Sequence, residues 1–209
     1  AYLDGLVAAG LDHVQITLES HDEAIHDRMV GAKAWQETVQ GIRNAIDADL
    51  HVTTNTTLTR ANVVEIDRTV DFIAALGVPT FACNGLIYSG QGKSYDLAIS
   101  EQELAETLEV VTEAAERNGA VVVLDIQPGR YDFLTVAKRW KWALEHPLVG
   151  LALDPEWRMG PGQVPGRVIG SVRANEVNGV SAWLDRLTRR QNLPEKVFML
   201  HQFRDSMIV

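Results

Sequence analysis

Residues 120–126 read AVVVLDI, a continuous apolar run with a single acidic residue near its end. Runs of this kind are typical of strands that are buried on both faces of a parallel sheet. Just before the run, a helical pattern over residues 100–118 opens with the capping-box sequence SEQE and stops at Gly119. A helix that leads into a buried parallel strand is the building unit of an α/β fold.

The same alternation extends from this stretch in both directions. Apolar and β-branched runs predict five further strands, at residues 13–18, 50–58, 80–86, 150–153 and 196–200. Apolar residues spaced by three and four predict further helices at residues 38–48, 63–76, 133–144 and 175–190. Strands separated by helices pair in parallel through right-handed crossovers. A complete TIM barrel needs eight units and ~250 residues. Six units therefore predict a partial TIM-type (β/α) barrel, with an open doubly wound sheet as the alternative.

Composition excludes several classes of function. The 209 residues carry a formal net charge of −9, which argues against sequence-independent nucleic-acid binding. No apolar run approaches the ~20 residues of a membrane span, and no signal peptide is visible, so we expect a cytoplasmic protein. Cys83 is the only cysteine. It can form no intrachain disulfide and no cysteine-based zinc or iron–sulfur site within this chain.

The organisation of the chain is less sharply marked. Residues 1–6 resemble the middle of a helix and the last residues follow directly on a strand, so both ends look cut from something longer. No linker is obvious. The motifs change character at Asn118-Gly119, which predicts two half barrels, residues 1–119 and 120–209, packed as one domain.

Functional side chains of parallel α/β folds gather where strands end. In the first half, we expect the candidates to be Thr17, Glu19, Asn55, Arg60 and Asn84. An asparagine inside an otherwise buried strand must find polar partners, so Asn55 is the strongest candidate for facing a ligand.

Other polar residues near these strand ends have simpler explanations. Ser20 and Asn62 fit a structural role, as a helix cap or turn residue, about as well as a functional one. His21 and His26 flank an acidic loop and are expected to be exposed.

In the second half, Asp154 and Glu156 follow directly on a predicted strand. Two carboxylates there can have different surroundings and different pKa values, as acid–base catalysis requires. Asp125 and His201 end nearby strands, so we take these four residues as the catalytic candidates. The same groups can hold a divalent metal through oxygen and imidazole ligands, although the sequence alone assigns no metal site. The alternative is a polar barrel mouth with satisfied hydrogen bonds.

One loop stands apart from the catalytic candidates. Residues 160–167, GPGQVPGR, lack the lysine and serine or threonine of a phosphate-binding loop. They are interpreted as a lid or a structural loop.

Several motifs in the first 119 residues occur together in an order that is specific. They are GLDHVQITLES at 10–20, HD at 26–27, GIRNA at 41–45, TNTTLTRAN at 54–62, LGV at 76–78 and NGLIYSG at 84–90. This order resembles the second half of the radical SAM barrel found in enzymes that mature peptides and cofactors. In that family, a strand ending in S-L-D, an H-D helix start and a T-L-x-R-x-N strand end follow one another.

The resemblance implies S-adenosylmethionine (SAM) and a [4Fe–4S] cluster as cofactors. It places Thr17 and Glu19 at polar positions that face SAM, Asn55 and Asn84 near its ribose and methionine ends, and Arg60 with Asn62 at the strand end. The C-x-x-x-C-x-x-C loop and the Gly-Gly-Glu motif of the family are absent, and both lie earlier in its barrel. Without three cysteine thiolates no cluster forms, so we expect the chain as it stands to be catalytically incompetent.

Residues 121–209 resemble instead an uncharacterised bacterial family of lipoproteins or secreted proteins, also with β/α barrels. The residues that carry this likeness are LDIQPGR at 124–130, VGLALDPEW at 149–157, GQVPG at 162–166 and LHQF at 200–203. The strand-end Asp, Glu and His residues suggest a hydrolase or a carbohydrate-binding barrel.

A chimera of two half barrels, joined near residues 118–121, would explain both resemblances. The three hypotheses are therefore a radical SAM fragment, a hydrolase-like barrel and an inactive chimeric scaffold. A small molecule is the expected ligand, and open barrel edges favour self-association.

Overall fold

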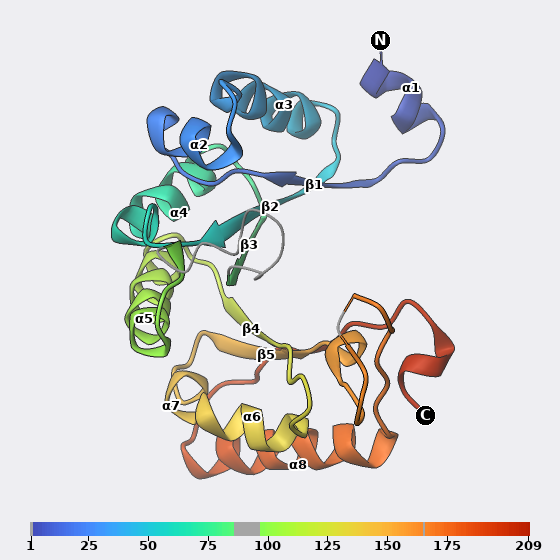
Figure 1. The fold of residues 1–209 in the computed structure, drawn as a ribbon. Coiled ribbons are helices and arrows are strands. Elements are labelled where there is room, and N and C mark those ends of the chain that lie inside the picture. The colour runs from blue at the N-terminus through green and yellow to red at the C-terminus, as the bar shows by residue number, and fades with distance from the viewer. Residues whose placement is uncertain (1, 86–96, 165) are drawn as a thin grey trace. The chain divides into compact units, whose positions relative to one another are not determined.

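The computed structural model describes residues 2–85, 97–164 and 166–209 (Figure 1). Contacts between residues divide the chain into two compact units, Ala1–Asn118 and Gly119–Val209, called unit 1 and unit 2 below. All six strands of the described residues pair in parallel, three in each unit, and they close no barrel. The predicted α/β class with about six parallel β/α units is confirmed.

Unit 1 is built on a sheet in the order β1-β2-β3. In parallel register, Thr17 pairs with Asn55 and Thr57 pairs with Asn84. The elements of unit 1 are α1 (Tyr2–Ala8), β1 (His13–Thr17), α2 (Glu23–Val30), α3 (Trp35–Asp47), β2 (His51–Leu58), the 3-10 turn η1 (Val63–Glu65), α4 (Ile66–Ala75), β3 (Thr80–Gly85) and α5 (Glu101–Arg117).

The core of unit 1 lies between its sheet and the apolar stripes of its helices. Leu18, Ile42 and Val52 are completely buried there, and Trp35 stacks on Phe72 with ring centroids 5.8 Å apart. Helix α5 carries the predicted capping box, in which the Ser100 and Glu103 side chains each accept the other's backbone N–H. The capping sequence thus marked this helix correctly.

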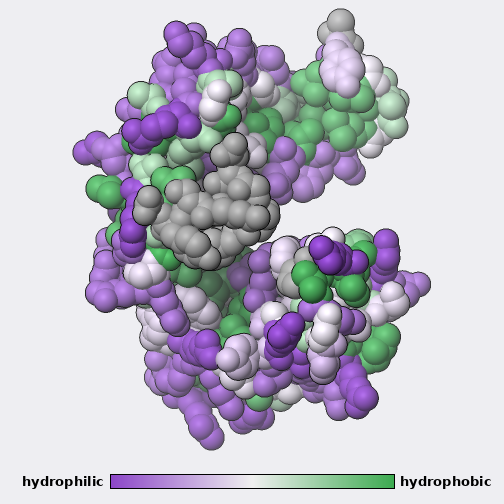
Figure 2. Space-filling view, viewed as in Figure 1, coloured by the Kyte–Doolittle hydropathy of each residue, from purple (hydrophilic) through white to green (hydrophobic). Residues whose placement is uncertain are grey.

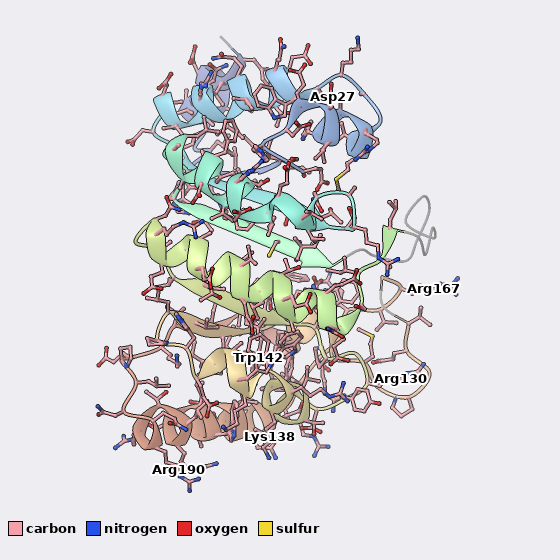
Figure 3. The ribbon with its side chains drawn as sticks, turned by 90° about the vertical axis from the view of Figure 1, so that its left-hand side faces the viewer. Asp27, Arg130, Lys138, Trp142, Arg167 and Arg190 are labelled. Carbon is pink, nitrogen blue, oxygen red and sulfur yellow. The ribbon has the colours of Figure 1, made fainter. Side chains whose placement is uncertain are left out.

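Helix α3 takes its cap from another helix. Its first residues have no side-chain cap of their own, but Asp27 of α2 accepts the backbone N–H groups of Ala34 and Trp35, each at 2.9 Å (Figure 3). These bonds, the one from Ala34 first, hold the pKa of Asp27 below its usual range. The HD motif therefore lies inside α2, which begins at Glu23, rather than at a helix start.

Unit 2 is built on a sheet in the order β4-β5-β6, and every residue of the central strand β5 is buried. The helix expected over residues 133–144 is divided at Trp140. The elements of unit 2 are β4 (Val122–Ile126), α6 (Phe133–Arg139), α7 (Lys141–Leu144), β5 (Val149–Leu153), the 3-10 turn η4 (Pro155–Trp157), α8 (Ala174–Arg190), β6 (Phe198–Leu200) and the 3-10 turn η5 (Asp205–Met207).

Helices α6 and α8 pack together along one side of this sheet (Figure 1). Phe133, Leu151 and Val180 are completely buried in the core that these helices form with the sheet. Lys138 and Arg190 are exposed and project outward from these helices (Figure 3). The face seen in Figure 2 is mostly hydrophilic, with an apolar area over α1. Among the described residues, no helix is both long and apolar enough to cross a membrane.

Candidate functional site

Three of the residues predicted in the first half share one face of the unit 1 sheet, at its carboxyl end. Thr17 and Asn55 are direct neighbours on β1 and β2. Thr57 lies two residues after Asn55 and so shares its face, and because Thr57 pairs with Asn84 of β3, Asn84 lies on that face too. The Asn84 side-chain amide donates a hydrogen bond to Oδ1 of Asn55 at 2.8 Å. Thr17 and Asn84 are exposed and Asn55 is half-buried, so this polar face is open to a ligand.

Glu19 and Arg60 bind other parts of the protein. The buried Glu19 carboxylate accepts the backbone N–H of Thr57 at 2.7 Å and its hydroxyl at 3.2 Å. Burial raises the pKa of Glu19, and the two bonds from Thr57 act against that rise. The exposed Arg60 guanidinium pairs with Glu103 at the start of α5, with Nε 3.3 Å from Oε1. Their proposed roles toward SAM stay predictions.

Asn62 has a structural role that the sequence left open. Its side chain is 1% exposed and donates to the carbonyl oxygens of Glu19 at 2.8 Å and Thr57 at 2.9 Å. Its own oxygen accepts the N–H of Thr59 at 2.9 Å. It forms no cap on η1. Asn62 therefore ties the segment after β1 to the end of β2.

His26 was expected to be exposed, and that expectation is wrong. Helix α2 starts at Glu23 and turns His26 inward, where it is 1% exposed. His21 is partly buried beside Thr69 and Glu65. The local acidity of the loop suggested a solvated site, and the helical position that turns His26 inward became visible only in the structure.

The cysteine content does not fit an iron–sulfur cluster within these 209 residues. Cys83, on β3, is the single cysteine of the sequence, whereas a [4Fe–4S] cluster needs at least three thiolates from a radical SAM motif. The last part of the NGLIYSG motif, including Tyr88, lies outside the described residues.

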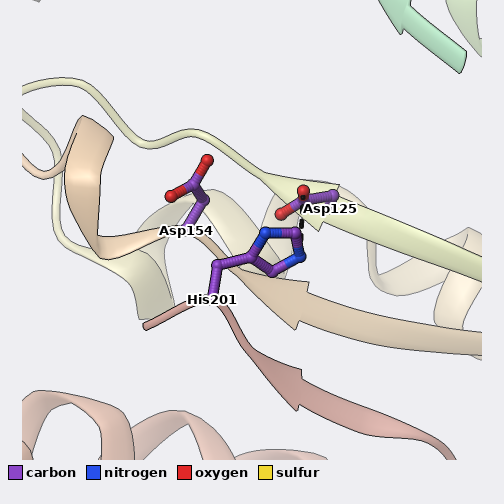
Figure 4. A group of neighbouring side chains, drawn as sticks. All are labelled: Asp125, Asp154 and His201. Carbon is purple, nitrogen blue, oxygen red and sulfur yellow. Dashed lines mark ion pairs between the residues drawn. The ribbon is translucent and has the colours of Figure 1, made fainter. Parts of the chain in front are cut away.

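In unit 2, three of the four catalytic candidates converge (Figure 4). Asp125 on β4, Asp154 after β5 and His201 after β6 each present a donor atom within 4.8 Å of the others. Nε2 of His201 lies 3.4 Å from Oδ2 of Asp125. The backbone fixes two of these positions, because the N–H of Asp154 donates to Ile126 O at 3.1 Å and that of His201 to Leu153 O at 3.0 Å.

The surroundings of this cluster raise the pKa values of both aspartates. Asp154 is 4% exposed, and burial together with the negative charges of Asp125 and Glu156 raises its pKa to about 6. Burial also raises the pKa of Asp125, which His201 partly offsets. Among the described residues, neither carboxylate forms an ion pair with a lysine or arginine.

Glu156 lies beside this cluster rather than in it. Its backbone N–H donates to Oδ1 of Asp154 at 3.3 Å, and its charge acts on both aspartates. It borders a cavity of about 270 Å³, whose other lining residues are Trp157, Gly166, Arg167, Val168 and Ile169. Part of the predicted lid loop, residues 160–167, thus contributes to this cavity, while Pro165 lies outside the described residues.

The turn that carries Asp154 and Glu156 packs closely against the main chain of Gly170. Gly170 N–H donates to Glu156 O at 2.7 Å, and a Cβ on Gly170 would lie 2.5 to 2.7 Å from three carbonyl oxygens of residues 155–158. Arg158 pairs with Glu176 of α8, with Nε 3.0 Å from Oε1. Glu176 also accepts the first N–H of α6.

Comparison with known proteins supports the first of the two resemblances. Residues 1–73 match the family model described as Radical SAM superfamily. A PqqA peptide cyclase from Methylorubrum populi is 28% identical over 129 residues, which cover 60% of this chain and 34% of the relative. A PqqA peptide cyclase from Rhizobium meliloti is 25% identical over 188 residues, which cover 86% and 49%. The chain thus spans about a third to a half of the length of these curated relatives.

Solved structures resemble the chain only loosely. A 3-keto-D-glucoside 4-epimerase from E. coli superposes with a TM-score of 0.41 at 14% identity, covering 94% of each chain. A probable 3-DHS dehydratase from Bacillus anthracis gives a TM-score of 0.36 at 12% identity, covering 92% of this chain and 93% of the other.

Proposed function

We propose that unit 1 is part of a radical SAM-type barrel and that its polar sheet face binds the adenosyl and methionine portions of SAM. The observation that carries this proposal is the shared face of Thr17, Asn55 and Asn84, which lies at the carboxyl end of a sheet in the region with radical SAM similarity. Ligands of parallel α/β folds bind at that end.

SAM binding and radical chemistry are separate properties in this proposal. When a [4Fe–4S] cluster is bound to a radical SAM barrel, it delivers the electron that cleaves SAM. The thiolates that such a cluster needs are not among these 209 residues. We therefore propose that this chain alone binds SAM without cleaving it.

The similarity to the Rhizobium meliloti cyclase bears on the proposed chimera. Unit 1 holds 118 of the 209 residues, so a match that covers 86% of the chain must reach into unit 2. This reach favours one continuous radical SAM-like chain. A join near residues 118–121 stays a prediction.

Titration calorimetry of the 209-residue chain with SAM tests this function. We expect weak binding that Asn55→Ala abolishes, because Asn55 is central to the polar face and anchors Asn84. Asn44→Ala is the matched control, since Asn44 is an exposed asparagine of α3 in the same unit. Equal binding by the parent and Asn55→Ala, or none by the parent, would refute the proposal.

A second candidate function rests on unit 2. The convergence of Asp125, Asp154 and His201 beside a cavity bordered by Glu156 supports hydrolase-like chemistry or sugar binding. In this reading, Glu156 contacts the substrate from the cavity wall and the other three residues polarise it.

The second function is tested with nitrophenyl glycosides and nitrophenyl esters. We expect Glu156→Gln to remove turnover, while Glu195→Gln, a change at an exposed glutamate of unit 2, leaves it unchanged. If Glu156→Gln retains full turnover, Glu156 has no part in the reaction.

A further inference from the structure

We propose that Asp125, Asp154 and His201 form a binding site for one divalent transition-metal ion. The three side chains come from the ends of three adjacent parallel strands and gather at one edge of the sheet, with the His201 ring facing Asp125 (Figure 4). This inference concerns residues of unit 2 only, and it is independent of SAM binding by unit 1.

The geometry of the donors is close to that of a coordination sphere. Oxygen and imidazole ligands lie about 2.0–2.2 Å from such a metal, so neighbouring ligands of a tetrahedral site are ~3.4 Å apart. The donor atoms here lie within 4.8 Å of one another, so binding an ion would require them to close by up to ~1.4 Å. Because the backbone bonds of Asp154 and His201 hold the strand ends in place, side-chain rotations would supply this closure.

Two further observations favour a cation at this point. Asp154 is 4% exposed, yet its carboxylate accepts only one hydrogen bond among the described residues, from the N–H of Glu156. A carboxylate has room for about four, so acceptor positions on this side chain are left for a further partner. The second observation is charge: two aspartates converge with no lysine or arginine paired to them in the described part of the chain. A divalent ion would balance both.

The donor set indicates the class of metal. Imidazole suits zinc, copper, iron and nickel, whereas magnesium and calcium prefer sites made of oxygen alone. One imidazole and two carboxylates match the borderline ion Zn²⁺ and the harder ion Mn²⁺, which favours carboxylate oxygen, and three protein ligands leave positions for water or a substrate. Glu156, whose backbone N–H donates to Oδ1 of Asp154, also lines the neighbouring cavity.

Direct titration tests the site without relying on any activity. The chelator-treated 209-residue chain is titrated with ZnCl₂ by calorimetry and with MnCl₂ by electron paramagnetic resonance. We expect one ion per chain at this site, and an at least 100-fold weaker affinity in Asp154→Asn and in His201→Gln. Circular dichroism of each variant checks that the fold is kept.

The chain supplies its own control for adventitious binding. His13 and His51 lie side by side on β1 and β2, with ring centroids 5.2 Å apart, and two such imidazoles can capture zinc. His51→Gln should therefore leave the proposed site unchanged. The proposal is overturned if the tight binding is lost in His51→Gln instead, if it persists in both Asp154→Asn and His201→Gln, or if the parent binds neither ion.

These outcomes also keep the site separate from the functions proposed above. Metal binding that depends on Asp154 and His201 stands whether or not nitrophenyl substrates are turned over. Loss of metal binding leaves the SAM titration of unit 1 unaffected.

Discussion

The backbone N–H of Glu19 donates a hydrogen bond to Nδ1 of the buried His26 at 3.1 Å. An acceptor nitrogen carries no proton, so the ring is neutral with its hydrogen on Nε2. Nε2 itself is buried and has no hydrogen-bond partner among the described residues. Both nitrogens of a protonated ring are donors, so protonation would set Nδ1–H against the N–H of Glu19 and place a charge in the interior.

This relationship predicts a loss of stability in mild acid. Burial lowers the pKa of His26 in the folded state, and the neighbouring Asp27 only partly opposes it. The unfolded chain, with an ordinary histidine pKa of about 6.5, then binds more protons than the folded chain below that pH. The contribution of His26 is therefore complete above pH ~6.5 and is lost as the pH falls toward the lowered folded pKa. Urea unfolding at pH 7.5 and pH 5.0 measures it.

Because other groups titrate in the same range, His26→Asn isolates the effect. The asparagine oxygen can still accept the Glu19 N–H, but it cannot take up a proton. The fall in the urea midpoint between the two pH values should be smaller in His26→Asn than in the parent and unchanged in His51→Gln. An identical fall in His26→Asn would show that the ring does not titrate on unfolding.

Asn62 predicts a large effect of a single buried polar side chain. Removing it in Asn62→Ala leaves the carbonyl oxygens of Glu19 and Thr57 and the N–H of Thr59 without their bonds. Each buried group left unpaired costs about 1–3 kcal/mol, so we expect a loss of at least ~2 kcal/mol in the free energy of unfolding. Denaturant titration measures it, with Asn44→Ala as the exposed control. A loss below ~0.5 kcal/mol would mean that water replaces these bonds.

Gly170 predicts a steric effect on the turn that carries Asp154. A methyl group at this position would overlap three carbonyl oxygens of the backbone, none of which can rotate away. We expect Gly170→Ala to cost about 1–3 kcal/mol or more and to weaken metal binding by displacing Asp154. Gly179→Ala in α8 is the matched control, because nothing lies within 4 Å of its added Cβ. Similar midpoints for the two variants would contradict the steric argument.

The outer strand of unit 2 predicts self-association. Among the described residues, β6 pairs only with β5, and apolar side chains on and around it are 39–60% exposed, namely Val197, Met199, Leu200 and Phe203. Open edges of this kind pair readily with another copy. We expect a concentration-dependent dimer by light scattering that Met199→Lys weakens, while Val64→Lys, at an exposed position in unit 1, does not. A parent chain that stays monomeric throughout would remove this expectation.

The sequence predicted most elements because their patterns are local. The apolar run of β5 and the capping box of α5 each specify their own element, and the structure has them where the pattern indicated. The strand-pairing into two sheets of three could not be predicted, because a closed barrel and open sheets share the same β/α period. The break between α6 and α7 at Trp140 could not be predicted either, because no proline or glycine marks it in the sequence.

Part of the candidate site could likewise be predicted from the sequence, and part could not. Convergence of Asp125, Asp154 and His201 followed from their positions at strand ends, since parallel strands end at one edge. The separate position of Glu156 and the burial of His26 depend on how a short turn and a helix are rotated, which no spacing in the sequence records.

The bonds from Asp154 and His201 to the neighbouring strands involve only the main chain. Any residue but proline can make them, so the positions after β5 and β6 are fixed in space whatever side chains they carry. Evolution, or a protein engineer, can therefore exchange the chemistry at this edge of unit 2 one residue at a time while inheriting the scaffold unchanged.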